Sequence, residues 1–435
     1  MTRYSNYNNS ETKWIGSIPD NWGISRLDRE AYIRARLGWR GLKADEYVSS
    51  GYGFLATPNI KGRDIDFTNI NFISAERYFE SPEIILDVGD VLLTKDGSTI
   101  GTTNIVRHLP FPCTVNGSIA VLTPTNGILP LYLYYYLTSP KAQDRFWYLQ
   151  DGQGVPHLFQ RDLRKIEIIK PPLEEQLAIV RHLENKTAEI DGLGERLWRE
   201  VELLEQYRRE LIARTVTRGL DPDVPMRDSG IEWIGAIPAA WSLQSLKTML
   251  WRTNIKNKPE RRVLSVERAK GVVDRETEGS PDNHNRLPED LSGYLAVNSG
   301  QFVMNKMKAW RGSYGVSTLD GIVSPAYYVF DLEFVEPKFF NWAIRSAAYV
   351  PFFGRDSYGI RTDQWDFKVS ALRSIPFFSP SRKEQKAIAS YLERETSVID
   401  STVTGIYQQI ELLAQYRKQV INDAVTGKIR VGKVA

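Results

Sequence analysis

The sequence lacks the residues on which disulfide-linked and metal-bound folds depend. Cys113 is its only cysteine, so the chain can form neither an internal disulfide nor a multi-cysteine metal site, as is usual in a reducing compartment. The four histidines show no metal-ligand spacing. No run of about 18 apolar residues occurs, and the first residues lack the apolar core of a signal peptide. We therefore expect a cytoplasmic protein with no metal site and no contact with a membrane.

Common catalytic motifs are missing as well. The sequence contains no phosphate-binding G-x-x-x-x-G-K-[ST] loop and no Asn-Pro-Pro-aromatic loop of the methyltransferase type. An acidic-x-Lys pattern of the nuclease type occurs at 184–186 and 384–386, but both copies fall on expected helix surfaces without an upstream acidic strand. We therefore expect a chain that is not an enzyme by itself and that holds no cofactor.

Length and composition point to an ordinary globular protein with several domains. At 435 residues the chain exceeds the ~100–200 residues of a common domain. Its hydrophobic fraction of 42% and charged fraction of 25% provide for a real core. The net charge of +3 is small, but a nucleic-acid binder needs only a local basic patch, so the total charge decides nothing.

The strongest signal is an internal repeat. A shift of 209 residues superposes 175–217 on 384–426 without a gap, with 18 of 43 positions identical. A second repeat, the motif W-I-G-x-I-P-x-x-W, occupies 14–22 and 233–241. Between the halves, Gly219 with Pro222 and Pro225 ends a helix and begins an extended linker. The chain therefore consists of motif, variable domain and long helix, followed by the same three parts again.

Apolar residues at intervals of seven run through both repeats and predict one seam of a coiled coil. The seam consists of Leu183, Ile190, Leu197, Leu204 and Leu211 in the first repeat, and of Leu392, Ile399, Ile406, Leu413 and Val420 in the second. The companion seam is mixed and includes Arg208 and Arg417. Two similar stripes in one chain favour pairing with each other, because effective concentration favours the internal partner. A coiled coil that forms dimers is the alternative.

The variable regions, 23–170 and 242–380, predict mostly β structure with a few helices, because aromatic and β-branched residues alternate there with glycines. Each contains a strand that continues into a basic, glycine-containing first loop, at 89–101 and 300–312, and Lys95 and Lys306 take equivalent places. Each also contains a polar second loop, at 150–161 and 355–365. Such loops suit DNA contact, because Arg and Lys bond guanine, Asn and Gln bond adenine, and all of them bond phosphate.

We expect DNA-contacting side chains on these four loops, with a merely solvated turn as the alternative for each residue. In the first variable region they are Lys95, Asp96, Ser98, Thr99, Gln150, Gln153, His157, Gln160 and Arg161. In the second they are Asn305, Lys306, Lys308, Arg311, Tyr358, Arg361 and Gln364. The first loop of the second region is the more basic, so the two regions should recognise different sequences.

This layout resembles the specificity subunit of type I restriction-modification enzymes over essentially the whole chain. The resemblance rests on the doubled W-I-G-x-I-P-x-x-W motif, the P-P-L-E-E-Q and S-R-K-E-Q helix starts, the E-L-L-x-Q-Y-R segments and the A-V-T-G-K-I segment near the end. It implies an α+β fold, in which two mixed α/β target recognition domains with mostly β cores are separated by two long helices that pair as an antiparallel coiled coil. The expected parts are an N-terminal segment 1–22, recognition domains 23–172 and 242–380, a linker with the second motif 219–241, a central helix 173–218, and a distal helix with the C-terminal tail 381–435.

The resemblance also implies a function and partners. Each recognition domain would read one half of a split, asymmetric target in double-stranded DNA, and the helix pair would set the spacing and dock two methyltransferase (modification) subunits. That complex would methylate adenine N6, and restriction subunits would add ATP-dependent translocation and cleavage. S-adenosylmethionine, ATP and Mg would then belong to the partner subunits. A coiled-coil scaffold that assembles partners without reading DNA is the alternative.

Overall fold

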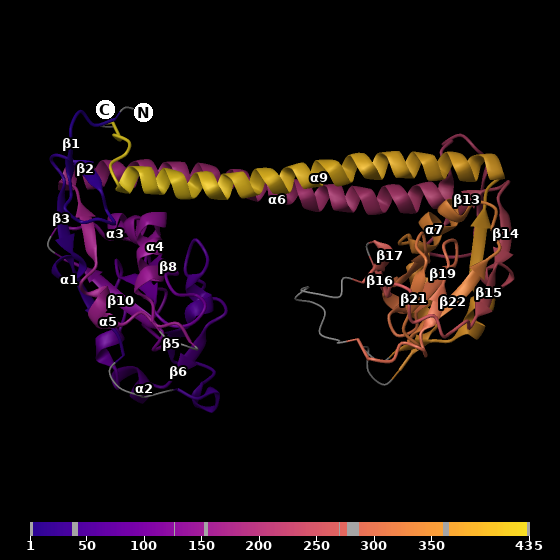
Figure 1. The fold of residues 1–435 in the computed structure, drawn as a ribbon, viewed down its shortest axis with the longest axis horizontal. Helices are drawn as coiled ribbons and strands as arrows, with labels where there is room; N and C mark the ends of the chain where they lie inside the picture. The colour runs from indigo at the N-terminus through magenta and orange to yellow at the C-terminus, as the bar shows by residue number, and fades with distance from the viewer. Residues whose placement is uncertain are drawn as a thin grey trace. The chain divides into compact units, whose positions relative to one another are not determined.

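The computed structural model describes residues 3–36, 42–125, 127–151, 155–268, 270–275, 287–359 and 365–432. The chain divides into two compact units, residues 1–197 with 408–435 and residues 198–407. Two long helices, α6 (Leu173–Arg218) and α9 (Arg382–Val425), each contribute one part to each unit (Figure 1). We describe each unit by itself.

The first unit is built on a four-stranded antiparallel sheet. Its strands, in spatial order, are β4 (Ala31–Arg34), β10 (Ile119–Pro124), β7 (Val91–Thr94) and β8 (Thr103–Ile105). Successive side chains of a strand point to opposite faces of the sheet. Val91 and Leu93 accordingly belong to the core that contains α3, whereas Leu92 belongs to a second core. Strand β7 is an unbroken apolar run because both of its faces are covered.

Smaller elements complete the first unit. A three-stranded sheet contains β6 (Asn71–Ile73), β5 (Tyr52–Leu55) and β9 (Cys113–Val115). Two further pairs are β1 (Tyr7–Asn9) with β2 (Ser17–Pro19), and β3 (Gly23–Arg26) with β11 (Glu167–Lys170). The short helices are α1 (Leu27–Glu30), α2 (Ala75–Phe79), α3 (Pro130–Thr138), α4 (Pro140–Leu149) and α5 (Gln160–Leu163). Helices α3 and α4 both begin with proline, which fits the first helical position because no N–H is needed there.

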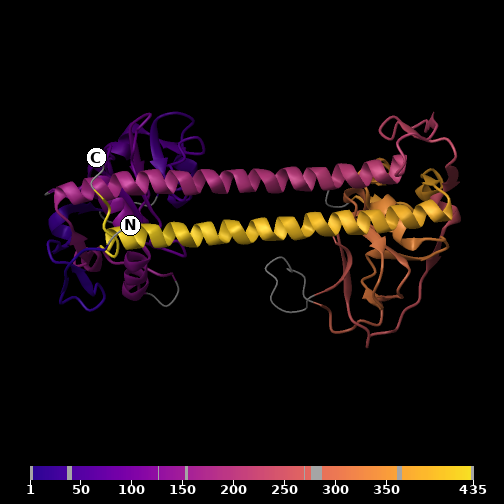
Figure 2. The same ribbon diagram turned by 90° about the horizontal axis from the view of Figure 1, so that it is seen from above.

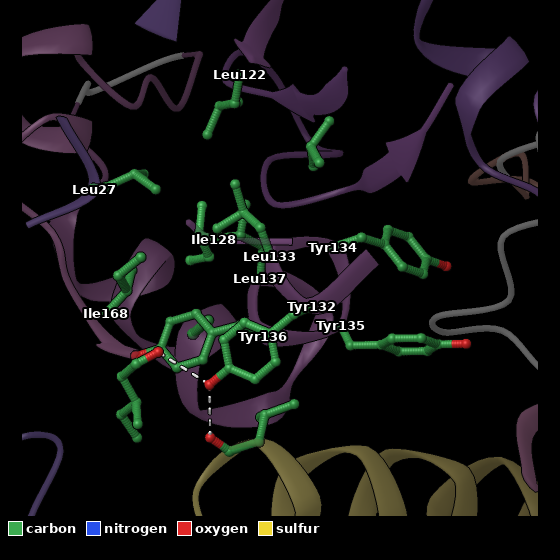
Figure 3. Close-up of a cluster of buried hydrophobic side chains, with 14 of the residues drawn as sticks. Leu27, Leu122, Ile128, Tyr132, Leu133, Tyr134, Tyr135, Tyr136, Leu137 and Ile168 are labelled. Carbon is green, nitrogen blue, oxygen red and sulfur yellow. Dashed lines mark hydrogen bonds between the residues drawn. The ribbon is translucent and has the colours of Figure 1, made fainter. Parts of the chain in front are cut away.

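Tyrosines of α3 connect the sheet to both long helices. Tyr132 and Tyr135 are buried in the cluster that Figure 3 shows. The Tyr132 hydroxyl lies 3.0 Å from the carbonyl oxygen of Ile169 and 3.4 Å from that of Val425 on α9. The Tyr135 hydroxyl donates to Glu184 Oε1 on α6 at 2.5 Å. A buried tyrosine needs a partner for its polar tip, and here the long helices supply one for each ring.

The second unit repeats this plan. Its four-stranded sheet has the corresponding order β15 (Leu250–Thr253), β22 (Tyr327–Leu332), β19 (Phe302–Asn305) and β20 (Tyr314–Val316). The other pairs are β12 (Met226–Asp228) with β13 (Ala236–Pro238), β14 (Ser242–Ser245) with β25 (Pro376–Ser379), β16 (Leu264–Glu267) with β17 (Gly271–Asp274), β18 (Leu295–Val297) with β21 (Gly321–Val323), and β23 (Ser357–Tyr358) with β24 (Asp366–Phe367). Helices α7 (Pro337–Arg345) and α8 (Val350–Arg355) pack on them. The predicted α+β fold with sheet-rich domains and long helices is confirmed.

Within each unit, parts of α6 and α9 lie side by side and run in opposite directions (Figures 1 and 2). In the first unit, Leu183 near the start of α6 shares a core with Val420 near the end of α9. In the second unit, Ile212 near the end of α6 shares a core with Leu392 near the start of α9. The antiparallel pairing of the two repeats, rather than a dimer-forming coiled coil, is therefore the arrangement in this chain.

The predicted seam is buried over most of its length. Seven of its residues are buried, namely Leu183, Ile190, Leu197, Leu392, Ile399, Ile406 and Val420, and Leu204, Leu211 and Leu413 are half-buried. The polar companion seam forms two equivalent ion pairs. Arg417 Nε donates to Asp191 Oδ1 at 2.8 Å in the first unit, and Arg208 Nε lies 3.1 Å from Asp400 Oδ1 in the second. Because a polar contact within an apolar seam specifies register, these pairs favour one alignment of α6 against α9.

A glutamate at the start of each long helix binds the last tryptophan of a W-I-G motif. Trp22 Nε1 donates to Glu175 Oε2 at 2.7 Å, and Trp241 Nε1 donates to Glu384 Oε1 at 3.3 Å. Burial, with a contribution from the nearby Asp221 charge, raises the pKa of Glu384 above its usual value. The repeated glutamate and the repeated tryptophan, far apart in the sequence, are thus the two partners of one contact.

The same tryptophans cover the ends of the long helices. Gly219 and Gly427 follow α6 and α9 with φ of +75° and +71°, the left-handed conformation that ends helices and favours glycine. A Cβ atom on Gly427 would lie 3.1 Å from the Trp22 ring, and one on Gly219 would lie 3.5 Å from the Trp241 ring. Trp22 therefore contacts the start of α6 and the end of α9, and Trp241 contacts the start of α9 and the end of α6.

Leu392→Ala should lower the free energy of unfolding by about 2–5 kcal/mol, because the Leu392 side chain is fully buried between α9 and the core of the second unit. Leu412→Ala, on the same helix, should change it by less than about 0.5 kcal/mol, because Leu412 is 62% exposed. Urea denaturation followed by circular dichroism measures both. Equal losses would contradict the packing of α9 described above.

Candidate nucleic-acid interface

Lys95 and Lys306 occupy the same backbone position in their units. The Lys95 N–H donates to the Ser118 carbonyl at 2.8 Å, and the Lys95 carbonyl accepts from the Leu158 N–H at 2.8 Å. For Lys306 the partners are the Ala326 carbonyl at 3.0 Å and the Phe367 N–H at 3.1 Å. Each lysine thus lies directly after a central strand, between the start of the next strand and the end of the second loop.

These backbone contacts bring the first and second loops of each unit together. In the first unit Gly97 N–H also donates to the Pro156 carbonyl at 2.9 Å, and Asp151 pairs with His157 through two backbone hydrogen bonds. The two loops are more than forty residues apart in the sequence. Their convergence was not part of the sequence prediction, since it depends on the strand order of the sheet.

Side chains of the first unit form a continuous chain of contacts across the two loops. Lys95 Nζ lies 2.8 Å from Asp96 Oδ2, and the other Asp96 oxygen bonds His157 Nδ1. The His157 ring contacts the Phe159 ring edge-on at 4.5 Å, and the Arg161 guanidinium lies 4.8 Å from the centre of the Phe159 ring. Asp96 therefore positions both a lysine and a histidine, while Arg161 is exposed and its Nε lies 3.4 Å from Asp162 Oδ2.

The remaining predicted residues of the first unit differ in accessibility. Ser98 is exposed and Thr99 half-buried at the tip of the first loop. Gln150 is half-buried at the end of α4, and Gln160 Nε2 donates to the Ile33 carbonyl at 3.3 Å, which gives Gln160 an internal contact. Gln153 lies outside the described residues.

The first loop of the second unit presents three cations with different surroundings. Asn305 Oδ1 accepts the backbone N–H groups of Met307 and Lys308, which closes the turn after β19. Lys308 is exposed, whereas Lys306 is half-buried. Arg311 lies 4.3 Å from the centre of the Trp310 ring, and that arrangement orients its exposed guanidinium beside an aromatic face.

The second loop of this unit contributes an exposed tyrosine. Tyr358 is 63% exposed and pairs with Asp366 across β23 and β24, next to the strand end that carries Lys306. Two predicted residues, Arg361 and Gln364, lie outside the described residues.

Sequence reasoning missed three exposed cations of the second unit, Arg252, Lys256 and Lys258. They lie on β15 and in the segment that follows it, and Arg252 Cζ is 4.9 Å from the centre of the Tyr328 ring. The signal was present, because residues 252–262 contain five cations and only one acid. It was overlooked because strand β15 is next to the first loop only through the sheet, not along the chain.

No group of three or more potential metal-ligating side chains occurs among the residues that the structure describes. None of the described helices is long and apolar enough to cross a membrane.

Comparison with known proteins matches the arrangement above. Residues 49–202 match the family model of the type I restriction modification DNA specificity domain. The MjaVIII type I restriction enzyme specificity subunit of Methanocaldococcus jannaschii is 25% identical, with 95% of this chain and 94% of the relative covered. The StySPI specificity subunit of Salmonella potsdam is 18% identical, with 95% and 90% covered.

Solved structures share the fold. A chain from a study of complex assembly and conformational transition of the type I R-M system superposes with a TM-score of 0.67 at 14% identity, covering 95% of this chain and 99% of that one. The HsdS subunit of Thermoanaerobacter tengcongensis superposes with a TM-score of 0.51 at 14% identity, covering 95% and 98%. Residues 49–202 thus belong to the DNA-specificity domain of type I restriction modification, and the chain as a whole is similar to type I specificity subunits over nearly its full length.

Two glycines of the first loop provide a matched test of how α4 positions it. Gly97 and Gly101 have φ of +82° and +86°, so alanine at either is strained by roughly 1–2 kcal/mol. A Cβ atom on Gly101 would lie 2.3 Å from Gln143 Oε1 of α4, whereas one on Gly97 meets nothing within 4 Å. Gln143 Nε2 donates to the carbonyls of Gly101 and Leu137 at 2.8 and 2.7 Å.

Gly101→Ala should therefore cost about 1–3 kcal/mol more unfolding free energy than Gly97→Ala, because a displaced Gln143 no longer donates to the buried Leu137 carbonyl. Urea denaturation measures the difference. If the two variants lose equal stability, Gln143 does not hold the loop.

Proposed function

We propose that this chain is the non-catalytic, sequence-specific DNA-binding subunit of a type I restriction-modification complex, in which each recognition domain reads one half of a bipartite, asymmetric target. The observation that carries the proposal is the doubled pair of converging loops, one pair in each unit, with the same backbone arrangement and different side chains. Residues 23–172 and 242–380 are the proposed recognition domains. A cytoplasmic location is part of this proposal, because the protein would act on DNA.

The side chains on the loops suit base and phosphate contacts. Arg161, Lys308 and Arg311 are exposed donors that can bond guanine or phosphate, and Ser98 can serve either. The loops differ in charge, since an aspartate follows Lys95 whereas Met307 and a further lysine follow Lys306. A target with two different half-sites is therefore expected, rather than a palindrome.

The methyl donor, ATP and magnesium belong, in this proposal, to the partner subunits. Two methyltransferase subunits would transfer the methyl group to adenine, and restriction subunits would translocate and cut. The specificity subunit would supply the choice of sequence, with the continuous helices α6 and α9 holding its two domains at a set spacing.

Two exposed Leu–Tyr pairs support docking of two copies of one partner. Leu203 and Tyr207 lie on α6 in the second unit, and Leu412 and Tyr416 lie on α9 in the first. The pairs are related by the 209-residue repeat, and all four side chains are about half exposed or more. Residues four apart are neighbours on one helix face, and exposed apolar groups of this kind mark interaction sites. A methyltransferase subunit that fits one pair would fit the other.

Exchange of residues 23–172 for the corresponding segment of a relative should change one half-site of the methylated sequence and leave the other unchanged. The exchanged and the parent chain, each co-expressed with the methyltransferase subunits, are compared by mapping methylated adenines. A change in both halves, or in neither, would contradict independent recognition domains. If methylation is lost although the complex assembles, the exchange is repeated with the corresponding segment of a second relative.

Charged residues at one Leu–Tyr pair should remove one partner subunit. For Leu412→Asp with Tyr416→Asp we expect a complex with one methyltransferase subunit instead of two, and the same change at Leu203 and Tyr207 in addition should abolish assembly. Sedimentation velocity of the co-expressed complexes measures the stoichiometry. Ala414→Asp, an exposed site on another face of α9, is the matched control and should retain two partners. If the fourfold variant still assembles with two methyltransferase subunits, the docking proposal is wrong.

A further inference from the structure

Three cations of the second unit lie beside the first loop without an acidic partner. Among the residues that the structure describes, no carboxylate oxygen lies within 4.0 Å of the charged nitrogen atoms of Arg252, Lys256 or Lys306. Arg252 and Lys256 are exposed and Lys306 is half-buried. Surface cations are commonly left unpaired, so the geometry around them has to decide whether they form a site.

One aromatic ring holds two of these cations together. Tyr328 lies on β22, with Arg252 on the neighbouring strand β15 and Lys306 just beyond the other neighbour, β19. Arg252 Cζ is 4.9 Å and Lys306 Nζ is 4.6 Å from the centre of the ring. The ring attracts each charge through its electron-rich π system, and the sheet fixes all three backbones.

The Lys306 ammonium group is only partly satisfied. One of its three donors bonds the Pro325 carbonyl at 2.6 Å, which leaves two for a ligand. Burial, followed by the charge of Arg252, lowers the pKa of Lys306; the Asp366 charge raises it in part, and the Lys256 charge lowers it. The cluster thus keeps like charges close together with no carboxylate in ion-pair contact, and a bound anion would relieve their repulsion.

The first unit lacks this arrangement. By strand register, Ile33 and Ala120 take the places of Arg252 and Tyr328. Lys95, which corresponds to Lys306, pairs with Asp96. Its other cations near β4 are also bound, since Arg34 lies 2.7 Å from Asp90 and Arg36 lies 3.8 Å from Glu80. The charges that are neutralised internally in one unit are available in the other.

We propose that Arg252 and Lys306, held on the two sides of Tyr328, bind a backbone phosphate of the DNA, and that the second unit therefore provides the more salt-sensitive share of DNA affinity. This inference rests on the proposed function and deepens it by naming the ligand group and the unit. Guanidinium and ammonium donors are the groups that bind phosphate oxygens in proteins. Tyr328 is a positioning residue, because it acts through the two cations.

The first experiment measures the salt dependence of DNA affinity in the complex with methyltransferase subunits. Loss of one phosphate contact lowers the slope of log Kd against log salt by about 0.9, so the ratio of Kd values at 200 and 50 mM salt should fall about threefold for Arg252→Gln. Lys383→Gln, an equal charge change on the exposed start of α9, is the matched control and should keep the parent slope. If the complex with Arg252→Gln has the same slope of log Kd against log salt as the parent complex, the proposal is wrong.

The second experiment identifies the ligand as one DNA phosphate. Duplexes carry a single uncharged methylphosphonate linkage at successive positions of the half-site that the second unit reads. One position should weaken binding by the parent complex by the same factor as Arg252→Gln, and the two changes together should cost no more than either alone. Additive losses at every position would show that Arg252 binds no individual phosphate.

These outcomes separate the inference from the proposed function. If the complex discriminates its target from other DNA but Arg252→Gln leaves its affinity unchanged, the proposed function stands and this inference is wrong. A complex that binds every duplex equally loses the proposed function itself. Thermal midpoints of the variants equal to that of the parent establish that altered binding is not due to unfolding, and Tyr328→Phe, which keeps the ring, should bind like the parent.

Discussion

The contact between a motif tryptophan and a helix-initiating glutamate holds the rest of the structure together. Trp22 bonds Glu175 at the start of α6 and packs on Gly427 after α9, while Trp241 bonds Glu384 at the start of α9 and packs on Gly219 after α6. Each motif thus closes one helix start and one helix end at the same place. Because both long helices must meet at each tryptophan, their antiparallel pairing follows from where the two motifs lie in the chain.

The two four-stranded sheets have a different role from the paired long helices. The central strands β7 and β19 contact a core on both faces and are fixed by packing, while the loops at the strand ends are free to vary. The backbone contacts of Lys95 and Lys306 have the same pattern although the loops share little sequence. A common scaffold with independent side chains allows the two units to recognise different DNA sequences. It also allows them to contribute unequally to the electrostatic attraction of DNA.

How well the sequence predicted each part depends on the range of the interactions involved. The helices and their seam were predictable because Leu183, Ile190 and Leu392 repeat with a local period that a long helix imposes. The loops were located correctly along the chain as polar, glycine-containing segments. The cations Arg252 and Lys256 were missed, because a strand neighbour brings them to the first loop from more than forty residues away. The roles of the individual loop residues stay predictions.

The amino-acid sequence alone determined that the protein is doubled, that its repeats form long helices, and that basic and polar loops recur at matching places, because each of these leaves a local or periodic trace. Only the tertiary structure decided which side chains act together. Lys95 is neutralised by Asp96 and linked to His157, whereas Lys306 shares Tyr328 with Arg252. Strand order and register make that difference, and hydrogen bonding between strands distant in sequence leaves no trace in the spacing of residues along the chain.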